Sequence, residues 1–431
     1  MTLSERDLKH IWHPCARMQD FAKYPPLHIL SAKGALLNTP YGEIIDAIGS
    51  WWCKPLGHRP EVVISAIQDQ LQSFEHVITA QTTNNKMVEL GEKLAGLSKL
   101  PYTFFSSDGS SAVEVALKLT LHARKIEGYK EKTSFLALNN GYHGETLATL
   151  SVSDLGDFKE PYKSHCFTSN YVKVPYTKGM NDASSLNAKR EFFAVLPYLE
   201  TIKPTLNALI FEPIVQGAAG MRTYSVDFLN QLLKWAKNNK IYCIADEIMT
   251  GLCRTGNWFA TDYLTEKPDI MCIAKGLTAG TLPLSCTLIS QELFDIFYFA
   301  KQHAPFLHSH THSGNALAIS AALATLNYME TIDLNTKATI LQQKLHQAFK
   351  QISAQTKALT NIRGIGGIIA GCLSFSDHEH LQRFTNIAQK RGALLRPIGN
   401  SLYWFPPINI EEYQLAKLTD ITYESIKESL L

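Results

Sequence analysis

The chain has 431 residues, more than one hydrophobic core usually supports, so a large domain with a smaller companion is expected. Lys and Arg together number 41 and Asp and Glu 39, which leaves a formal charge of +2 without long basic or acidic blocks. This balance gives no support to a protein that binds nucleic acid or a membrane surface.

The opening residues, MTLSERDLKH, are polar where a secretory signal needs an apolar core. The sequence has no run of about 18 apolar residues, so no transmembrane helix is expected. The eight cysteines are scattered without a CxxC pair, which argues against a zinc ribbon and favours reduced thiols. We therefore expect a cytoplasmic protein.

The middle of the chain has the most regular pattern. Short apolar runs, each expected to form a strand, lie at residues 103–107, 134–140, 208–213, 241–247 and 269–276. Helix-like segments separate these runs, which predicts βα units and a mostly parallel sheet buried on both faces. One of these segments, residues 226–240, places Phe228, Leu232 and Trp235 on one face and is predicted as a crossover helix.

Beyond Thr331 the pattern changes. A long helical segment at 336–355 is followed by strands near 368–375 and 393–397, which predicts a smaller α+β domain. The first 60 residues, rich in proline and aromatic residues, are expected to join it. The predicted division is an N-terminal segment 1–60 that contributes to the small domain, a large domain 61–330 and a C-terminal small domain 331–431.

A turn rich in serine and glycine follows the first of the predicted strands. In open α/β sheets, ligands bind beyond the carboxyl ends of the strands. The spacing of Ser111 and Glu114 fits a capping box, and Gly109 and Ser110 leave backbone N–H groups uncovered. The turn is therefore either an anion site or an ordinary helix start.

Two adjacent carboxylates, Asp246 and Glu247, end the apolar run IYCIA. They could act as a general acid and base, bind a metal, or balance the charge of a cationic cofactor. A plainer explanation is that they only cap the next turn. The local sequence leaves these four roles open.

Lys275 ends another apolar strand, and Tyr142 and His143 follow a third. Lys275 either reaches solvent or is a desolvated amine that attacks a carbonyl. The rings of Tyr142 and His143 either anchor a loop or stack on a planar ligand. Together, a phosphate-binding turn, an aromatic ring, a buried Asp and a strand-end Lys meet the requirements of pyridoxal 5'-phosphate.

Four longer motifs carry a family resemblance. FEPIVQGAAGM, IADEIMTGLCRTG, CIAKGLTAG and HSGNALA, in this order, resemble the class III aminotransferases of the fold type I pyridoxal-phosphate superfamily. The resemblance covers nearly the whole chain. It implies an α/β fold, with a large domain built on a mostly parallel sheet and a smaller α+β domain built from both termini. It also implies a homodimer with shared active sites.

The resemblance assigns roles to individual residues. Lys275 is expected to bind the cofactor covalently and to act as the catalytic base, and Asp246 to pair with the ring nitrogen. The phosphate site is expected to be completed by a residue of the second subunit, Thr311. The implied cofactor contacts are Gly109, Ser110, Tyr142, Asp246, Lys275, His310 and Thr311. The implied substrate contacts are Trp51, Tyr142, Lys275, Ser309 and Arg396, with Trp52 and Arg254 as second choices and Glu247 in a supporting role.

Motifs near both ends of the chain resemble one particular branch of this family. IWHPC (11–15), GSWW (49–52) and LLRPIGNSLYWFPP (394–407) are similar to the branch of the family that aminates 8-amino-7-oxononanoate to 7,8-diaminononanoate in biotin biosynthesis. The implied reaction is a ping-pong transamination with S-adenosylmethionine as the usual donor. In this branch, Arg396 is expected to pair with the carboxylate of the keto acid.

Three positions depart from that branch. Cys15 stands where the branch usually has tyrosine, and Ser309 and His310 replace the Gly-Pro of a His-Gly-Pro-Thr motif. Cys15 is therefore a possible site of substrate specificity, and lysine is an alternative donor. The sequence is also compatible with another class III omega-aminotransferase, with an aminomutase, which is an isomerase, and with a non-catalytic binding dimer.

The run HSHTH could place His308, His310 and His312 on one side of an extended segment, where they could bind zinc or nickel. The run contains no carboxylate or cysteine, and the resemblance places it at the dimer interface. We therefore expect no metal.

Overall fold

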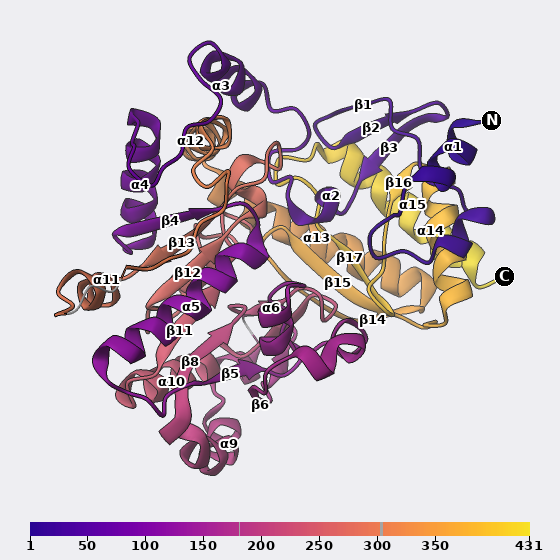
Figure 1. Cartoon of the computed structure of the whole chain (residues 1–431). Helices are drawn as coiled ribbons and strands as arrows, with labels where there is room; N and C mark the ends of the chain where they lie inside the picture. Colours follow the sequence, from indigo (N-terminus) through magenta and orange to yellow (C-terminus); the bar gives the residue numbers. More distant parts are fainter. Residues whose placement is uncertain (181, 302–304) are drawn as a thin grey trace.

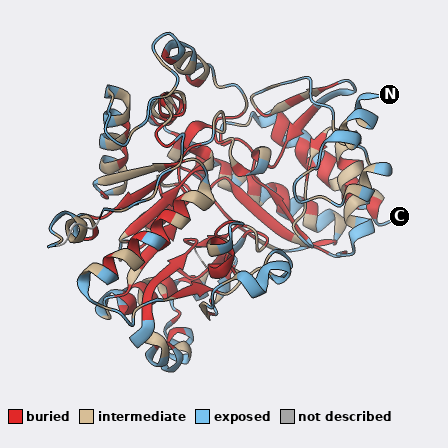
Figure 2. Cartoon of the chain, in the orientation of Figure 1, coloured by how far each residue is buried: buried red, intermediate tan, exposed pale blue. Residues whose placement is uncertain are grey.

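The computed structural model describes residues 1–180, 182–301 and 305–431. A large sheet with its helices forms one part of the molecule, and both chain termini lie in the other part, on the right in Figure 1. Burial is concentrated in the strands and in the helix faces against them (Figure 2). No helix among the described residues is both long and apolar enough to cross a membrane.

The large sheet has seven strands in the order β4-β13-β12-β11-β8-β5-β6. Their bounds are β4 (Tyr102–Ser106), β13 (Ser285–Ile289), β12 (Ile270–Ile273), β11 (Tyr242–Asp246), β8 (Leu206–Phe211), β5 (Ser134–Leu138) and β6 (Asn170–Val172). Strand β13 runs opposite to the other six strands of this sheet. The prediction of a mostly parallel sheet is confirmed, and β6 and β13 add to the five expected strands.

Helices cover both faces of this sheet, which explains why its strands are apolar throughout. All six residues of β8 are buried, and its apolar residues are divided between two clusters. Leu209 and Phe211 pack in the cluster that contains α10 (Val226–Asn238), whereas Ala208 and Ile210 pack in the cluster that contains α5 (Gly109–Glu127). Since neighbouring residues of a strand point to opposite faces, a strand between two helical layers has no polar face.

Other helices of this part surround the sheet. They are α3 (Glu61–Leu71), α4 (Asn85–Ser98), α6 (Leu147–Val152), α7 (Gly156–Lys159), α8 (Ala183–Leu186), α9 (Lys189–Ile202), α11 (Gln291–Tyr298) and α12 (Ala316–Thr331). A short three-stranded sheet combines β7 (Tyr176–Thr177), β10 (Arg222–Tyr224) and β9 (Val215–Gln216).

The smaller part contains two sheets. One is antiparallel, with β14 (Leu359–Ile365), β15 (Ile368–Leu373) and β17 (Ser401–Trp404). It shares a core with α13 (Leu334–Thr356), α14 (His378–Arg391) and α15 (Glu412–Ser429). The other contains β1 (Ser31–Lys33), β2 (Leu36–Thr39), β3 (Gly42–Asp46) and β16 (Ala393–Leu394), preceded in the chain by α1 (Leu3–His10).

Strand β16 pairs in parallel with β3, and this pairing joins the two ends of the chain in one sheet. The expected fold, an α/β large domain with an α+β companion built from both termini, is therefore confirmed. The division at residues 60 and 330 stays a proposal.

Candidate active site

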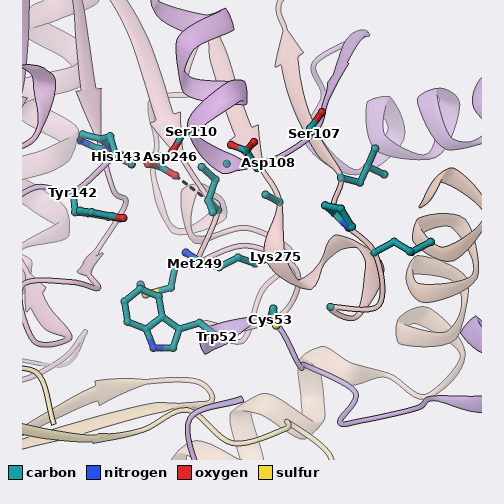
Figure 3. Close-up of a pocket in the computed structure, with 18 of the residues that line it drawn as sticks. Trp52, Cys53, Ser107, Asp108, Ser110, Tyr142, His143, Asp246, Met249 and Lys275 are labelled. Atoms are coloured by element: carbon teal, nitrogen blue, oxygen red, sulfur yellow. Dashed lines mark hydrogen bonds and ion pairs between the residues drawn. The ribbon is translucent and has the colours of Figure 1, made fainter. Parts of the chain in front are cut away.

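A cavity of about 430 Å³ opens at the carboxyl end of the parallel strands. Figure 3 shows its lining, to which α5, β11 and the segment after β12 all contribute. The structure brings together five predicted cofactor contacts here: Gly109, Ser110, Tyr142, Asp246 and Lys275.

One wall of the cavity is the N-terminus of α5. The helix begins at Gly109, and the carboxylate of Asp108 accepts a hydrogen bond from the N–H of Ser111 at 3.0 Å. The capping box predicted from Ser111 and Glu114 is therefore wrong: Asp108 is the cap, and Glu114 instead accepts a hydrogen bond from Thr146 at 2.5 Å. Several residues of SSDGSS can cap a helix, and the apolar pattern did not determine which of them does.

The N–H groups of Gly109 and Ser110 lie in the first turn, where a helix offers them no carbonyl partner, so they are available to an anion. Two glycines keep this end of the cavity open. A β-carbon on Gly109 would lie 3.0 Å from Ile248 Cδ1, and one on Gly144, whose φ is +124°, would meet the hydroxyl of Ser110. The predicted anion site thus offers the N–H groups of Gly109 and Ser110 as donors, and the backbone around it is closely packed at Gly109 and Gly144.

Asp246 ends β11 with its carboxylate in the cavity and only 5% of its surface exposed. Its Oδ2 lies 2.8 Å from Nδ1 of His143, and its Oδ1 accepts a hydrogen bond from the N–H of Ile248 at 3.2 Å. Since a carboxylate only accepts, Nδ1 of His143 carries the proton. The sequence suggested His143 only as a ring beside a planar ligand, whereas the structure makes it the partner of Asp246.

Glu247 lies outside the cavity lining. It is buried, and its carboxyl accepts hydrogen bonds from the hydroxyl of Thr250 at 2.6 Å and from the N–H groups of Ala260 at 3.1 Å and Thr261 at 2.7 Å. Burial raises the pKa of Glu247 to about 7. The two adjacent carboxylates therefore have different roles, since Asp246 lines the cavity and Glu247 does not.

Glu212, which the sequence did not single out, lines the cavity beside Asp246. Its carboxyl accepts hydrogen bonds from the N–H of Tyr142 at 3.0 Å and from that of Gly217 at 2.9 Å. Burial raises its pKa to about 7. Its position directly after the apolar run ALIF, equivalent to that of Asp246 after IYCIA, is the signal that could have identified it.

Lys275 follows β12 and begins a 3₁₀ turn, Lys275–Thr278, with a φ of +44°. Desolvation by burial lowers the pKa of its amine, while Asp246 and Glu212 act in the opposite direction. The lowered pKa increases the neutral fraction, which is the nucleophilic form. Its Nζ lies 4.8 Å from the ring centroid of Trp52, which the family resemblance implied only as a second choice.

Tyr142 forms the wall opposite Lys275 in Figure 3. Its hydroxyl donates a hydrogen bond to Glu145 at 2.8 Å, and its ring meets that of Phe158 edge to face. Burial and then the hydrogen bond to Glu145 raise the pKa of the hydroxyl, so Tyr142 stays protonated.

Arg396, Trp51 and Cys15 form an outer cluster that does not line the cavity itself. The guanidinium of Arg396 lies 4.4 Å from the ring centroid of Trp51, and it donates a hydrogen bond to the carbonyl of Cys15 at 2.7 Å. Burial and then the carboxylate of Glu145 raise the pKa of the Cys15 thiol, while Arg396 lowers it. The cluster therefore lies beside Glu145, the partner of Tyr142.

Arg254, the other second choice, is elsewhere. It is buried over the ring of Phe405 at 3.9 Å and donates hydrogen bonds to the carbonyls of Gly367 at 3.1 Å and Pro406 at 2.7 Å. Burial lowers the pKa of its guanidinium to about 9. It ties the loop after β11 to the smaller part of the molecule.

Ser309, His310 and Thr311 lie between α11 and α12 and do not line the cavity of their own chain. The histidines of this segment do not converge on one point. His308 faces His310, with 3.3 Å between their Nε2 atoms, whereas the ring of His312 faces His76. Among the described residues, no group of three His, Cys, Asp or Glu side chains is arranged to hold a metal ion.

Known proteins share this sequence and fold. The Aminotransferase class-III family model matches residues 20–426. The adenosylmethionine-8-amino-7-oxononanoate aminotransferase of Helicobacter pylori is 34% identical over 426 residues, which cover 96% of this chain and 95% of that protein. The crystal structure of the enzyme of that name from Methanocaldococcus jannaschii has a TM-score of 0.91 and 30% identity, covering 100% of this chain and 99% of that chain.

An amine transaminase from an uncultivated Pseudomonas species, solved in its PLP-bound form, has a TM-score of 0.89 and 28% identity over 97% of this chain and 98% of that chain. The family suggested by the four motifs is thus confirmed over nearly the whole sequence. The chain belongs to the class III aminotransferases and is a pyridoxal-phosphate-dependent aminotransferase.

Proposed function

We propose that this aminotransferase converts the ketone of 8-amino-7-oxononanoate to an amine and so forms 7,8-diaminononanoate for biotin in the cytoplasm. The observation that carries the proposal is Arg396 stacked on Trp51 at 4.4 Å, outside the cavity that holds Lys275. This keto acid has an apolar chain between its ketone and its carboxylate. It therefore needs an amine inside the cavity, an aromatic wall, and a cation farther out. The names of the full-length relatives support the same substrate.

The residues present fit pyridoxal phosphate. The free N–H groups of Gly109 and Ser110 suit its phosphate, and Gly144 leaves room beside them because a β-carbon there would meet Ser110. Asp246 supplies a carboxylate for the ring nitrogen, and Lys275 supplies a buried amine for the aldehyde. When bound, the cofactor withdraws electrons from the carbon that carries the amino group.

The chain's own residues perform the remaining steps. The neutral form of Lys275, favoured by its lowered pKa, takes and returns a proton at Nζ. His143 holds Asp246 in place through the 2.8 Å hydrogen bond and orients its carboxylate. Trp52 covers the amine of Lys275 and excludes water from one side.

We also propose a homodimer in which Ser309, His310 and Thr311 complete the site of the partner subunit. These residues lie away from the cavity of their own chain, and the neighbouring Leu307 is 83% exposed. Mixing an inactive Lys275→Ala subunit with an inactive Thr311 variant tests this arrangement. Random reassembly of equal amounts makes half of the dimers mixed, and one of the two sites in each mixed dimer is intact. Shared sites therefore predict that the mixtures regain up to about a quarter of wild-type activity. Mixtures as inactive as their parents would contradict the shared site.

S-adenosylmethionine is the proposed donor, and lysine is the second candidate because Cys15 lies against Arg396 where the related branch has tyrosine. The test offers S-adenosylmethionine, lysine, glutamate and ornithine separately to the purified yellow protein. The true donor bleaches it to the amino form of the cofactor, and 8-amino-7-oxononanoate then restores the colour. Bleaching without recovery by this keto acid would refute the proposed acceptor.

A further inference from the structure

The segment Gly49–Trp52, labelled α2, forms a left-handed helical turn. The φ angles of Gly49, Ser50, Trp51 and Trp52 are +55°, +44°, +69° and +73°. Two hydrogen bonds close the turn, from the N–H of Trp52 to the carbonyl of Ile48 at 3.0 Å and from Cys53 to Gly49 at 2.9 Å. The main chain therefore makes a complete turn of the hand opposite to an ordinary helix.

Three residues of this turn carry side chains, although L residues disfavour the left-handed region because Cβ crowds the following carbonyl. Only Gly49 has no such penalty, and it has a further constraint, since a β-carbon there would lie 2.8 Å from the carbonyl oxygen of Phe405. The surroundings must therefore hold Ser50, Trp51 and Trp52 in place.

The buried carboxylate of Asp46 lies beside the turn and forms hydrogen bonds with it. Oδ2 of Asp46 accepts hydrogen bonds from the hydroxyl of Ser50 at 2.7 Å and from Nε2 of His58 at 2.8 Å, and Oδ1 accepts the N–H of Ile48 at 3.3 Å. Asp46 has no exposed surface. Burial raises its pKa, but the hydrogen bonds from His58 and Ser50 outweigh this effect, so the net shift is downward and Asp46 is ionised.

The turn sends two neighbouring indoles in different directions. Trp51 is 41% exposed and stacks on Arg396 in the outer cluster. Trp52 is buried, donates a hydrogen bond from Nε1 to the hydroxyl of Tyr403 at 3.2 Å, and lies under the amine of Lys275. One short turn thus links the wall beside the reactive amine with the support of the carboxylate-binding arginine.

We propose that Asp46, Ser50 and His58 are positioning residues that hold the left-handed turn and thereby set both tryptophans for the keto acid. The proposal rests on the function proposed above, in which Arg396 receives the substrate carboxylate. None of the three residues lines the cavity, so they act through Trp51 and Trp52.

Two substitutions at one position test the proposal. Ser50→Ala removes the hydroxyl and keeps the β-carbon, whereas Ser50→Gly removes both and accepts a positive φ without strain. We expect Ser50→Ala to raise KM for 8-amino-7-oxononanoate at least about fivefold, with a smaller change in kcat. Ser50→Gly should return KM to within about twofold of wild type. The Tm of the cofactor-free proteins should be lowest for Ser50→Ala and closer to wild type for Ser50→Gly.

Lys99 offers a matched control, because it caps α4 with a φ of +64° and does not line the cavity. Lys99→Gly should be more stable than Lys99→Ala, yet neither should change KM. If Ser50→Ala does not fold while Ser50→Gly folds and is active, the hydroxyl is needed to hold the turn and the proposal stands.

Equal KM and equal Tm for the two Ser50 variants would overturn the proposal, as would a Ser50→Gly protein as impaired as Ser50→Ala. If instead the wild type does not aminate this keto acid, the proposed substrate fails. The Tm comparison of the two variants would still decide whether Ser50 holds the turn.

Discussion

Asp246→Asn is the substitution that isolates the role of the carboxylate at the end of β11. Asparagine keeps an oxygen for the N–H of Ile248, which lies 3.2 Å from the present Oδ1. It removes the charge and places an amide nitrogen where Oδ2 now lies 2.8 Å from Nδ1 of His143. A hydrogen bond to a charged group contributes about 1.5–3 kcal/mol. Losing the charge opposite the cofactor nitrogen should therefore lower kcat/KM by roughly 10- to 200-fold, since about 1.4 kcal/mol corresponds to tenfold.

The assay is single-turnover bleaching with the donor, followed by recovery with the keto acid, because both half reactions depend on the ring nitrogen. Asp269→Asn is the matched control. Asp269 is half-buried, and it accepts a hydrogen bond from the N–H of Cys243 at 2.7 Å at the opposite end of the same strands. It should change stability and leave both rates close to wild type. Asp246→Asn rates within about threefold of wild type, or an equal loss in Asp269→Asn, would refute the reasoning.

Lys275→Ala should abolish turnover while the protein still folds and binds the cofactor without a covalent bond, as seen in its absorption spectrum; turnover at the wild-type rate would contradict the catalytic role. Arg396→Met keeps an apolar side chain on Trp51 but removes the charge, so KM for the keto acid should rise roughly 10-fold or more; an unchanged KM would exclude Arg396 as the carboxylate partner. Glu247→Gln concerns stability. The folded pKa of Glu247, about 7, lies above the ordinary value of 4.5, so its contribution is complete below about pH 4.5 and is lost as pH rises through 7. The wild-type Tm should therefore fall between pH 5.5 and 8 by more than that of the variant, by an amount worth up to about 2 kcal/mol; equally steep curves would rule out this carboxyl as a source of the pH dependence.

The sheet could be predicted where the local pattern is sufficient. Strands buried on both faces appear as short apolar runs, and the runs ending in Asp246 and before Lys275 were found within a few residues of their ends. Neither β13 nor its direction was predicted, because Ser and Thr interrupt the apolar pattern of Ser285–Ile289. The length of the connection was a usable signal. Only 274–284 separates β12 from β13, less than most parallel crossovers need.

Contacts between distant segments explain what the sequence missed in the site. His143 lies on the loop after β5 and Asp246 ends β11. Since β8 separates these two strands in the sheet, no local spacing connects the two residues. The left-handed turn at Gly49–Trp52 is equally hidden. Asp46 and His58, which hold it, flank the GSWW motif, and only the fold shows that they meet at Ser50.

The parallel pairing of β16 with β3 has a consequence for how the protein folds during synthesis. Ile45 is made early, and its partner Ala393 emerges only near the end of translation. Pairings between such distant segments close slowly, because the entropy of a very long loop must be lost first. The large sheet can assemble before that time. Trp51 follows β3 in the chain and Arg396 follows β16, so the two side chains come together only when these strands pair. A ribosome-bound chain that lacks its last segment should therefore be able to form the cofactor end of the cavity before it can recognise a keto acid.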